Sequence, residues 1–97
     1  MMITVVELSE FLHKQIKKRQ LPDFILVKLQ DWVEDVENRG LEVVRRIPGY
    51  HDEPLKGKLA GIRSIKLGKG WRAYYQVKER ERVVVWVERI DKHEYGK

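Results

Sequence analysis

The chain has 97 residues, of which 42% are hydrophobic and 36% are charged, with a net charge of +5 and no cysteine. This length suits one domain with one core, and the density of apolar residues excludes a disordered chain. The lack of cysteine excludes a disulfide framework and a thiolate zinc site. Because no apolar run is long enough for a signal peptide or a membrane span, we expect a cytoplasmic protein with a single domain over residues 1–97.

The first part of the chain predicts one strand and two helices. Ile3–Val6 is short and β-branched, as strands favour, and Ser9 is a good N-cap for an amphipathic helix that reaches Arg19. A second helix begins at Pro22 and ends at Gly40, which we expect to supply a left-handed C-cap. The short connection between them predicts a helix hairpin.

The middle of the chain is less regular. Leu41–Ile47 is compatible either with a last helical extension or with an extended segment, and Pro48 ends it. Pro48–Gly61 then predicts a long loop. Loops of this length inside compact domains usually carry function.

Three later segments predict an antiparallel meander. Ile62–Leu67, Trp71–Lys78 and Arg82–Ile90 are rich in β-branched and aromatic residues and are separated by glycine-containing or charged turns. The third segment is apolar on both faces, which places it inside the sheet. Together the elements predict an α+β domain of two layers in the order βααβββ, in which the helix hairpin packs on a small, mainly antiparallel sheet.

The positive charge belongs to the second part of the chain. Residues 1–40 contain six Lys or Arg against seven Asp or Glu, whereas residues 41–97 contain fourteen against eight. Between Pro54 and Arg72 there are six cations and no acid. These cations are Lys56, Lys58, Arg63, Lys66, Lys69 and Arg72. The asymmetry indicates a polyanionic or acidic partner, although a solvated basic surface would give the same pattern.

Potential proton-transfer groups flank this basic stretch. Glu53 follows His51-Asp52 just upstream, and His93 lies near the chain end, two residues before Tyr95. Strand alternation places Lys66, Arg72 and Tyr74 on one face of the predicted sheet. Carboxylate, imidazole, cations and aromatic rings are the groups that RNA cleavage without a metal needs, so an RNA-directed nuclease is the hypothesis to test.

Five motifs resemble, in order and spacing, the RelE/HigB group of toxins from bacterial toxin–antitoxin modules. They are L-E-V-V-R-R-I-P-G, E-P-L-K-G, G-I-R-S-I-K-L, G-W-R-A-Y-Y and V-E-R-I-D-K-H. The order βααβββ is also that family's. Because members are ribosome-dependent mRNA endonucleases, the resemblance implies an mRNA interferase that cuts messenger RNA in the ribosomal A site. It also implies silencing by a cognate antitoxin.

The resemblance implies roles for individual residues. Glu53 matches the position of a general base, and Arg72 matches the arginine that contacts the scissile phosphate. His93 matches the C-terminal histidine of the HigB and YoeB branches, and Lys66 matches a basic position on the strand. Six further residues are expected to contact RNA: Lys56, Lys58, Arg63, Lys69, Tyr74 and Tyr95. The chain departs from the RelE branch at Ser64, where that branch has a second lysine.

With these roles, the RNA would be cut by its own 2′-hydroxyl. We expect Glu53 to act as base and His93 as acid, while Arg72 and Lys66 hold the phosphate. A histidine suits either proton role, so Glu53 and His93 could exchange parts. Tyr74 or Tyr95 could stack on an exposed base. No cofactor or metal is expected, because the scattered histidines give no metal-ligand spacing.

Other interpretations of the same residues stay open. Glu53 could cap a turn or pair with a lysine, Arg72 could bridge strands, and His93 could be a plain tail residue. A toxin of the ParE kind, which shares this fold, inhibits DNA gyrase through protein contacts and needs no catalytic histidine or glutamate. A catalytically inactive homologue that acts by protein binding is a third class.

Overall fold

Five strands form one sheet in the part of the chain that the computed structural model describes, residues 3–79 and 81–93. The strands are β1 (Thr4–Leu8), β2 (Glu53–Pro54), β3 (Arg63–Gly68), β4 (Trp71–Glu79) and β5 (Val83–Lys92). Their order is β1-β5-β4-β3-β2, with β1 parallel to β5 and the other neighbours antiparallel. The predicted meander is confirmed, and β5 lies inside the sheet, as its two apolar faces indicated.

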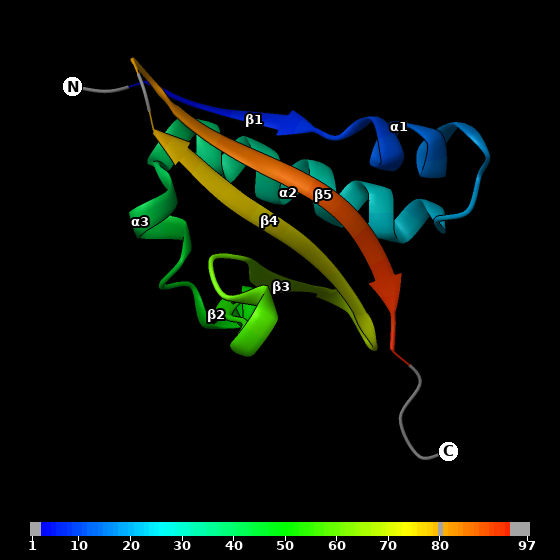
Figure 1. The fold of residues 1–97 in the computed structure, drawn as a ribbon. Helices are drawn as coiled ribbons and strands as arrows, with labels where there is room; N and C mark the ends of the chain where they lie inside the picture. The colour runs from blue at the N-terminus through cyan, green and yellow to red at the C-terminus, as the bar shows by residue number, and fades with distance from the viewer. Residues whose placement is uncertain (1–2, 80, 94–97) are drawn as a thin grey trace.

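The helices precede β3 along the chain. They are α1 (Glu10–Lys17), α2 (Asp23–Arg39) and α3 (Leu41–Val44), followed by the 3₁₀ turns η1 (Pro48–Tyr50) and η2 (Gly57–Leu59). Ser9 begins α1 as predicted, because its Oγ accepts a hydrogen bond from the Leu12 amide at 2.9 Å. Figure 1 shows α1 and α2 on one side of the sheet. No helix in the described residues has the length and apolar character that a membrane crossing needs.

Gly40 joins α2 to α3 in a conformation that differs from the predicted cap. Its φ of 85° is positive, as glycine permits, but its ψ of 149° lies outside the left-handed helical region. The chain therefore leaves α2 through one extended residue and enters α3 at once. Leu41–Ile47, for which the sequence left two interpretations, is helical from Leu41 to Val44.

The segment predicted as a long loop contains a short strand. Within Pro48–Gly61, β2 pairs with β3 through Glu53 opposite Ser64 and Pro54 opposite Arg63. A pattern search passes over this strand because it has two residues, and because proline contributes no N–H to a sheet. The pairing matters for function, because it fixes Glu53 at the edge of the sheet beside β3.

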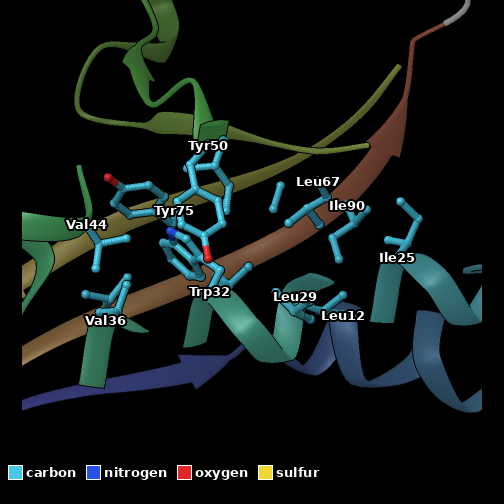
Figure 2. Close-up of a cluster of buried hydrophobic side chains, with 14 of the residues drawn as sticks. Leu12, Ile25, Leu29, Trp32, Val36, Val44, Tyr50, Leu67, Tyr75 and Ile90 are labelled. Carbon is cyan, nitrogen blue, oxygen red and sulfur yellow. The ribbon is translucent and has the colours of Figure 1, made fainter. Parts of the chain in front are cut away.

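The core lies between the helices and one face of the sheet. At the centre of this core, Trp32 of α2 is 1% exposed, and its ring centroid lies 5.4 Å from that of Tyr75 on β4 (Figure 2). The other buried side chains labelled there belong to the same core: Leu12, Ile25, Leu29, Val36, Val44, Tyr50, Leu67 and Ile90. Because this face is filled with apolar side chains, the polar residues that alternate with them lie on the opposite side of the strands.

We call that opposite side the open face. Cross-strand pairs and strand alternation assign its residues. They are Ser64 and Lys66 of β3, Arg72, Tyr74, Gln76 and Lys78 of β4, and Trp86, Arg89 and Asp91 of β5. The predicted placement of Lys66, Arg72 and Tyr74 on one face is therefore confirmed.

Candidate functional site on the open face

Arg72 is held in a fixed orientation on the open face. In the sheet it pairs with Lys66 on β3 and Asp91 on β5. Its Nε and Nη2 donate to Ser64 Oγ at 3.0 and 2.8 Å, and Nη2 also donates to the His51 carbonyl oxygen at 3.0 Å. The side chain is 15% exposed. Three hydrogen bonds thus fix the guanidinium plane, and an arginine fixed in this way is suited to directional contact with a phosphate.

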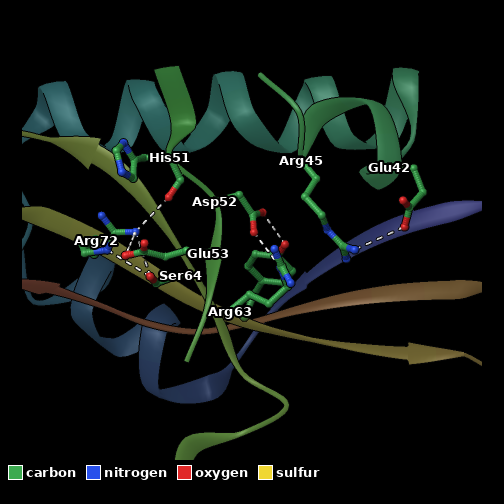
Figure 3. A network of polar contacts seen from close by, with 9 residues as sticks. Glu42, Arg45, His51, Asp52, Glu53, Arg63, Ser64 and Arg72 are labelled. Atoms are coloured by element: carbon green, nitrogen blue, oxygen red, sulfur yellow. Dashed lines mark hydrogen bonds and ion pairs between the residues drawn. The ribbon is translucent and has the colours of Figure 1, made fainter. Parts of the chain in front are cut away.

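Glu53 reaches the same guanidinium from β2. Its Oε1 lies 3.5 Å from Arg72 Nη2, and its side chain is 55% exposed (Figure 3). An ion pair this exposed contributes little to stability, because water screens it. The carboxylate can therefore exchange its contact with Arg72 for a contact with a ligand at small cost.

A pocket of about 340 Å³ opens beside Arg72. The turn between β3 and β4 forms one wall and the segment before β2 forms the other. The lining residues are His51, Glu53, Lys66, Gly68, Lys69, Gly70 and Arg72. With three cations and one carboxylate, the lining is suited to bind an anionic group. The carboxylate can also accept a proton from a group next to that anion.

A larger hollow, of about 690 Å³, lies at the far end of the open face. Its lining residues are Glu7, Lys78, Glu81, Arg82, Val84 and Trp86. There Lys78 Nζ stacks 4.7 Å from the Trp86 ring centroid, and Arg82 Nη2 lies 3.6 Å from Glu7 Oε2. Because two acids balance two bases, this hollow has no preference for an anion, and we assign the candidate site to the smaller pocket.

His93 joins the open face through Tyr74. Its Nε2 lies 2.6 Å from the Tyr74 hydroxyl, and its backbone N–H donates to the Gly70 carbonyl at 2.6 Å. Gly70 has a φ of +80°, and a Cβ there would lie 2.7 Å from the His93 carbonyl oxygen, so this approach requires glycine. Gly70 and Tyr74 each lie two residues from Arg72 along the chain, so His93 contacts the chain on both sides of Arg72.

Tyr74 is mostly buried on the open face. The whole residue is 6% exposed, and the Arg89 guanidinium carbon lies 4.3 Å from its ring centroid. This packing leaves little of the ring accessible for the predicted stacking on a nucleobase, which would require Arg89 to move. Burial, followed by the negative charge of Asp91, raises the pKa of Tyr74, so its hydroxyl stays protonated beside His93 Nε2.

Arg63 does not reach the open face. Alternation along β3 directs it to the other side of the strand from Ser64, and its Nε donates to Asp52 Oδ1 at 2.6 Å. The side chain of Asp52 is 1% exposed and that of Arg63 24% exposed. The guanidinium is therefore engaged by a buried carboxylate and does not line the pocket beside Arg72, so the predicted RNA contact of Arg63 stays a prediction.

The remaining predicted residues fall into three groups. Lys69 lines the pocket with Lys66, as expected for a phosphate contact. Lys56 and Lys58 are exposed beside and within η2 and are not among the pocket's lining residues. Tyr95 lies outside the described residues.

Sequence reasoning missed the groups that orient Arg72. Ser64 was noted as a departure from the RelE branch, yet its hydroxyl accepts two hydrogen bonds from Arg72. The His51 carbonyl is a backbone atom, which no motif of side chains can predict. The glycine at position 70, between two predicted strands, was the available signal that the chain closes tightly there, and its φ of +80° agrees with it.

No family model matches the chain, and no curated protein matches it in sequence. Solved structures match it closely in fold. A chain of the DinJ-YafQ toxin–antitoxin complex of E. coli aligns with a TM-score of 0.69 and 23% identity, over 98% of this chain and 100% of that one. This chain shares its fold with a protein of that complex.

Two further structures support the same fold. The toxin–antitoxin complex RelBE2 from Mycobacterium tuberculosis gives a TM-score of 0.65 at 24% identity, with 92% of this chain and 96% of that chain covered. The YoeB-YefM complex from Staphylococcus aureus gives 0.65 at 18% identity, with 93% and 95% covered. The RelE-like α+β fold that the motifs implied is therefore confirmed.

Proposed function

We propose that this chain is the toxin of a toxin–antitoxin pair and that it cleaves messenger RNA on the ribosome. The observation that carries the proposal is the Arg72 guanidinium, fixed by Ser64 and the His51 carbonyl and paired with Glu53 in a cationic pocket. Such a group is prepared to bind a phosphodiester. The fold and the RelE/HigB motifs support the same activity.

The reaction uses the 2′-hydroxyl of the RNA as its nucleophile. A base removes the hydroxyl proton, the oxygen attacks the adjacent phosphorus, and negative charge accumulates on the non-bridging oxygens. The bond to the 5′-oxygen then breaks, and an acid protonates that oxygen. The products are a 2′,3′-cyclic phosphate and a 5′-hydroxyl, and the reaction as written consumes no water, metal or cofactor.

Glu53 and Arg72 serve the first half of this reaction. Glu53 is exposed at the pocket wall and accepts the 2′-hydroxyl proton, while Arg72 and Lys66 face the developing charge on phosphorus. Charge that is already oriented needs no rearrangement at the transition state, which is why such groups contribute strongly to rate.

His93 serves the second half. Its Nε2 contacts the Tyr74 hydroxyl, which is itself held by burial and by the Arg89 side chain over its ring. In this role the imidazolium transfers a proton to the departing 5′-oxygen. A positioned acid or base of this kind contributes a factor of about 10² to 10⁴ to the rate.

The ribosome and an antitoxin complete the proposal. The pocket of about 340 Å³ has room for little more than one phosphodiester and its sugar, so we infer that the ribosome supplies most of the positioning of the messenger. The complexes named DinJ-YafQ and YoeB-YefM support a protein partner for this chain. Co-purification with a small partner protein tests that part.

A single-turnover cleavage assay on programmed ribosomes tests the activity. The expected products carry a 2′,3′-cyclic phosphate, or the 3′-phosphate formed when it opens, and a 5′-hydroxyl. A messenger with 2′-deoxyribose at the cut site should resist cleavage while it still binds. Intact messenger with wild-type protein would refute the nuclease, and inhibition of DNA gyrase by the same preparation would establish the ParE-like alternative.

A further inference from the structure

The segment that carries Glu53 is poorly held by its own backbone. β2 has two residues, and one of them is proline, which donates no N–H to β3. Just before it, His51 adopts φ 50° and ψ 49°, a left-handed conformation that costs a non-glycine residue about 1–2 kcal/mol. Strand pairing over two residues and the Leu55 N–H, which donates to the Ile62 carbonyl at 2.9 Å, attach the segment to β3, and a side-chain anchor before β2 adds to them.

Asp52 supplies this anchor from the opposite side of the segment. Its side chain is 1% exposed, and both carboxylate oxygens are used. Oδ1 accepts from Arg63 Nε of β3 at 2.6 Å, and Oδ2 accepts from the Tyr75 hydroxyl of β4 at 2.5 Å. We call these three residues the Asp52 cluster. It ties the segment to two strands of the sheet at a single residue.

The protonation states agree with this arrangement. Burial, and then the hydrogen bond to Asp52, raises the pKa of Tyr75, so its hydroxyl stays protonated and donates. Burial alone would lower the pKa of Arg63, but its hydrogen bond to Asp52 and the charge of that carboxylate raise it, so the guanidinium stays charged. Both donors therefore persist around neutral pH.

The neighbours of Asp52 both contact Arg72. The His51 carbonyl accepts from Arg72 Nη2 at 3.0 Å, and Glu53 Oε1 lies 3.5 Å from the same nitrogen (Figure 3). In an extended segment, consecutive side chains point to opposite sides, so an anchor at Asp52 on one side sets where Glu53 lies on the other. Within the segment His51–Glu53, the middle residue therefore belongs to the Asp52 cluster, and the two outer residues contact Arg72 in the candidate site.

We propose that Asp52 is a positioning residue, which through Arg63 and Tyr75 holds His51 and Glu53 in register with Arg72. Its effect on catalysis rests on the proposed ribonuclease activity, whereas its effect on the geometry does not. A shift of the carboxylate by about 1 Å is enough to lower a rate by about 10²-fold, which is why an anchor outside the pocket matters.

The first test measures cleavage in a double-mutant cycle. Asp52→Asn keeps the shape of the side chain but replaces one accepting oxygen by a donor, and it should lower the single-turnover rate by about 10- to 100-fold. In a Glu53→Gln background the same change should cost less than in the wild-type background, because the part of the loss that acts through Glu53 is already present and only the part through His51 and Arg72 remains. A loss of equal size in both backgrounds, or full activity of folded Asp52→Asn, would overturn the proposal.

The second test needs no RNA. The Arg72 Nη2 protons report its hydrogen bond to the His51 carbonyl, and Asp52→Asn should accelerate their exchange with solvent on the order of tenfold, the factor that one hydrogen bond represents. If wild-type protein proves unable to cleave RNA, the proposed function fails while this measurement still decides the role of Asp52. Unchanged exchange would refute the positioning role.

Two further variants keep the tests decisive. Val36→Ala opens a cavity in the core, because Val36 is fully buried on α2, and it should leave Arg72 exchange and the cleavage rate unchanged where it is folded. If Asp52→Asn does not fold, Tyr75→Phe removes one of the two hydrogen bonds of Asp52 with little change in volume. It should shift both measurements in the same direction, and unchanged values in a folded Tyr75→Phe protein would contradict the proposal.

Discussion

Two arginine–carboxylate pairs lie on opposite sides of the segment that carries Asp52 and Glu53, and they differ in burial although their chemical groups are the same. Asp52 and Arg63 meet at 2.6 Å with the carboxylate 1% exposed, whereas Glu53 and Arg72 meet at 3.5 Å with the carboxylate 55% exposed. The acids are consecutive in sequence, and alternation sends them to opposite sides. The inner pair is committed to the fold, and the outer pair is available to a ligand.

Burial is what separates the two pairs. A charge inside the protein loses its hydration and must keep its partner, so breaking the inner pair leaves an uncompensated ion. Water around the outer pair replaces whatever contact is lost, so the pair can open and close at little cost. We therefore expect inner substitutions to lower stability and to act on the reaction only indirectly, through the position of His51 and Glu53, whereas outer substitutions should act on the reaction directly with little change in stability.

Arg72→Ala tests the outer pair and should have the largest effect. The single-turnover cleavage rate on ribosomes should fall by about 10³-fold, equivalent to ~4 kcal/mol, because oriented charge at the phosphate is lost. Arg72→Lys keeps the charge without the planar fork and should fall between wild type and alanine. Lys14→Ala on α1, where the ammonium lies 3.6 Å from Glu10 in an exposed pair, is the matched cation control and should cleave normally. Wild-type rates for folded Arg72→Ala would remove the basis of the proposed site.

Arg63→Ala tests the inner pair and should act mainly on stability. Removing the guanidinium leaves Asp52 buried without its charge partner, at a cost of about 3 kcal/mol in the free energy of unfolding. For a domain of this size that corresponds to a melting temperature lower by roughly 10 °C or more. Calorimetry and ribosome pelleting should show lower stability with unchanged ribosome affinity. A loss of ribosome affinity at full stability would support Arg63 as an RNA contact.

Glu53→Gln and His93→Gln test whether the exposed groups act on the reaction and not on stability. Each substitution removes a proton-transfer group and keeps a polar side chain of similar size. Each should lower the single-turnover rate on the order of 10²-fold, because water is a poor substitute for a positioned acid or base. Ribosome affinity and melting temperature should stay near the wild-type values, since both side chains are exposed. If both variants cleaved at the wild-type rate, the acid–base scheme would be wrong, and catalysis would have to be purely positional.

The smallest expected effect is a fall in the free energy of unfolding at alkaline pH. Burial, and then a hydrogen bond to a carboxylate, raises the pKa of both Tyr75 and Tyr50 above that of an unfolded tyrosine. The folded protein then holds protons that the unfolded chain releases, so this stabilisation is complete below about pH 10 and is lost as the pH rises further. The free energy of unfolding should fall by up to about 1.4 kcal/mol per pH unit for each tyrosine. Tyr75→Phe and Tyr50→Phe should each flatten the dependence in chemical denaturation, and an unchanged slope would contradict the raised pKa values.

Local patterns predicted the elements that have strong local signals. Ser9 caps α1, the apolar stripe of α2 buries Trp32, and the three later strands form the meander. These features depend on spacing between near neighbours, which the sequence displays directly. β2 was missed because two residues, one of them proline, have no period of their own. It exists because β3 provides an edge with which it pairs.

The site was predictable in its residue types and only partly in its geometry. Motif resemblance singled out Glu53, Arg72 and His93, and alternation placed Arg72 and Lys66 on the same face. Tyr74 carried the same aromatic signal as a stacking residue, yet tertiary packing buries its ring beneath Arg89. The sequence does not show which aromatic ring another strand will cover.

By itself, the sequence determined that this chain builds a two-layer α+β domain and that its cations gather around the β3–β4 turn. Composition and short-range periodicity suffice for that, because hydrophobic burial and strand alternation act between neighbours along the chain. Tertiary structure alone decided which carboxylate is buried and which stays exposed. Asp52 and Glu53 are adjacent and chemically alike, but their environments differ. Asp52 contacts Arg63 and Tyr75 and is buried, whereas Glu53 contacts Arg72 and solvent.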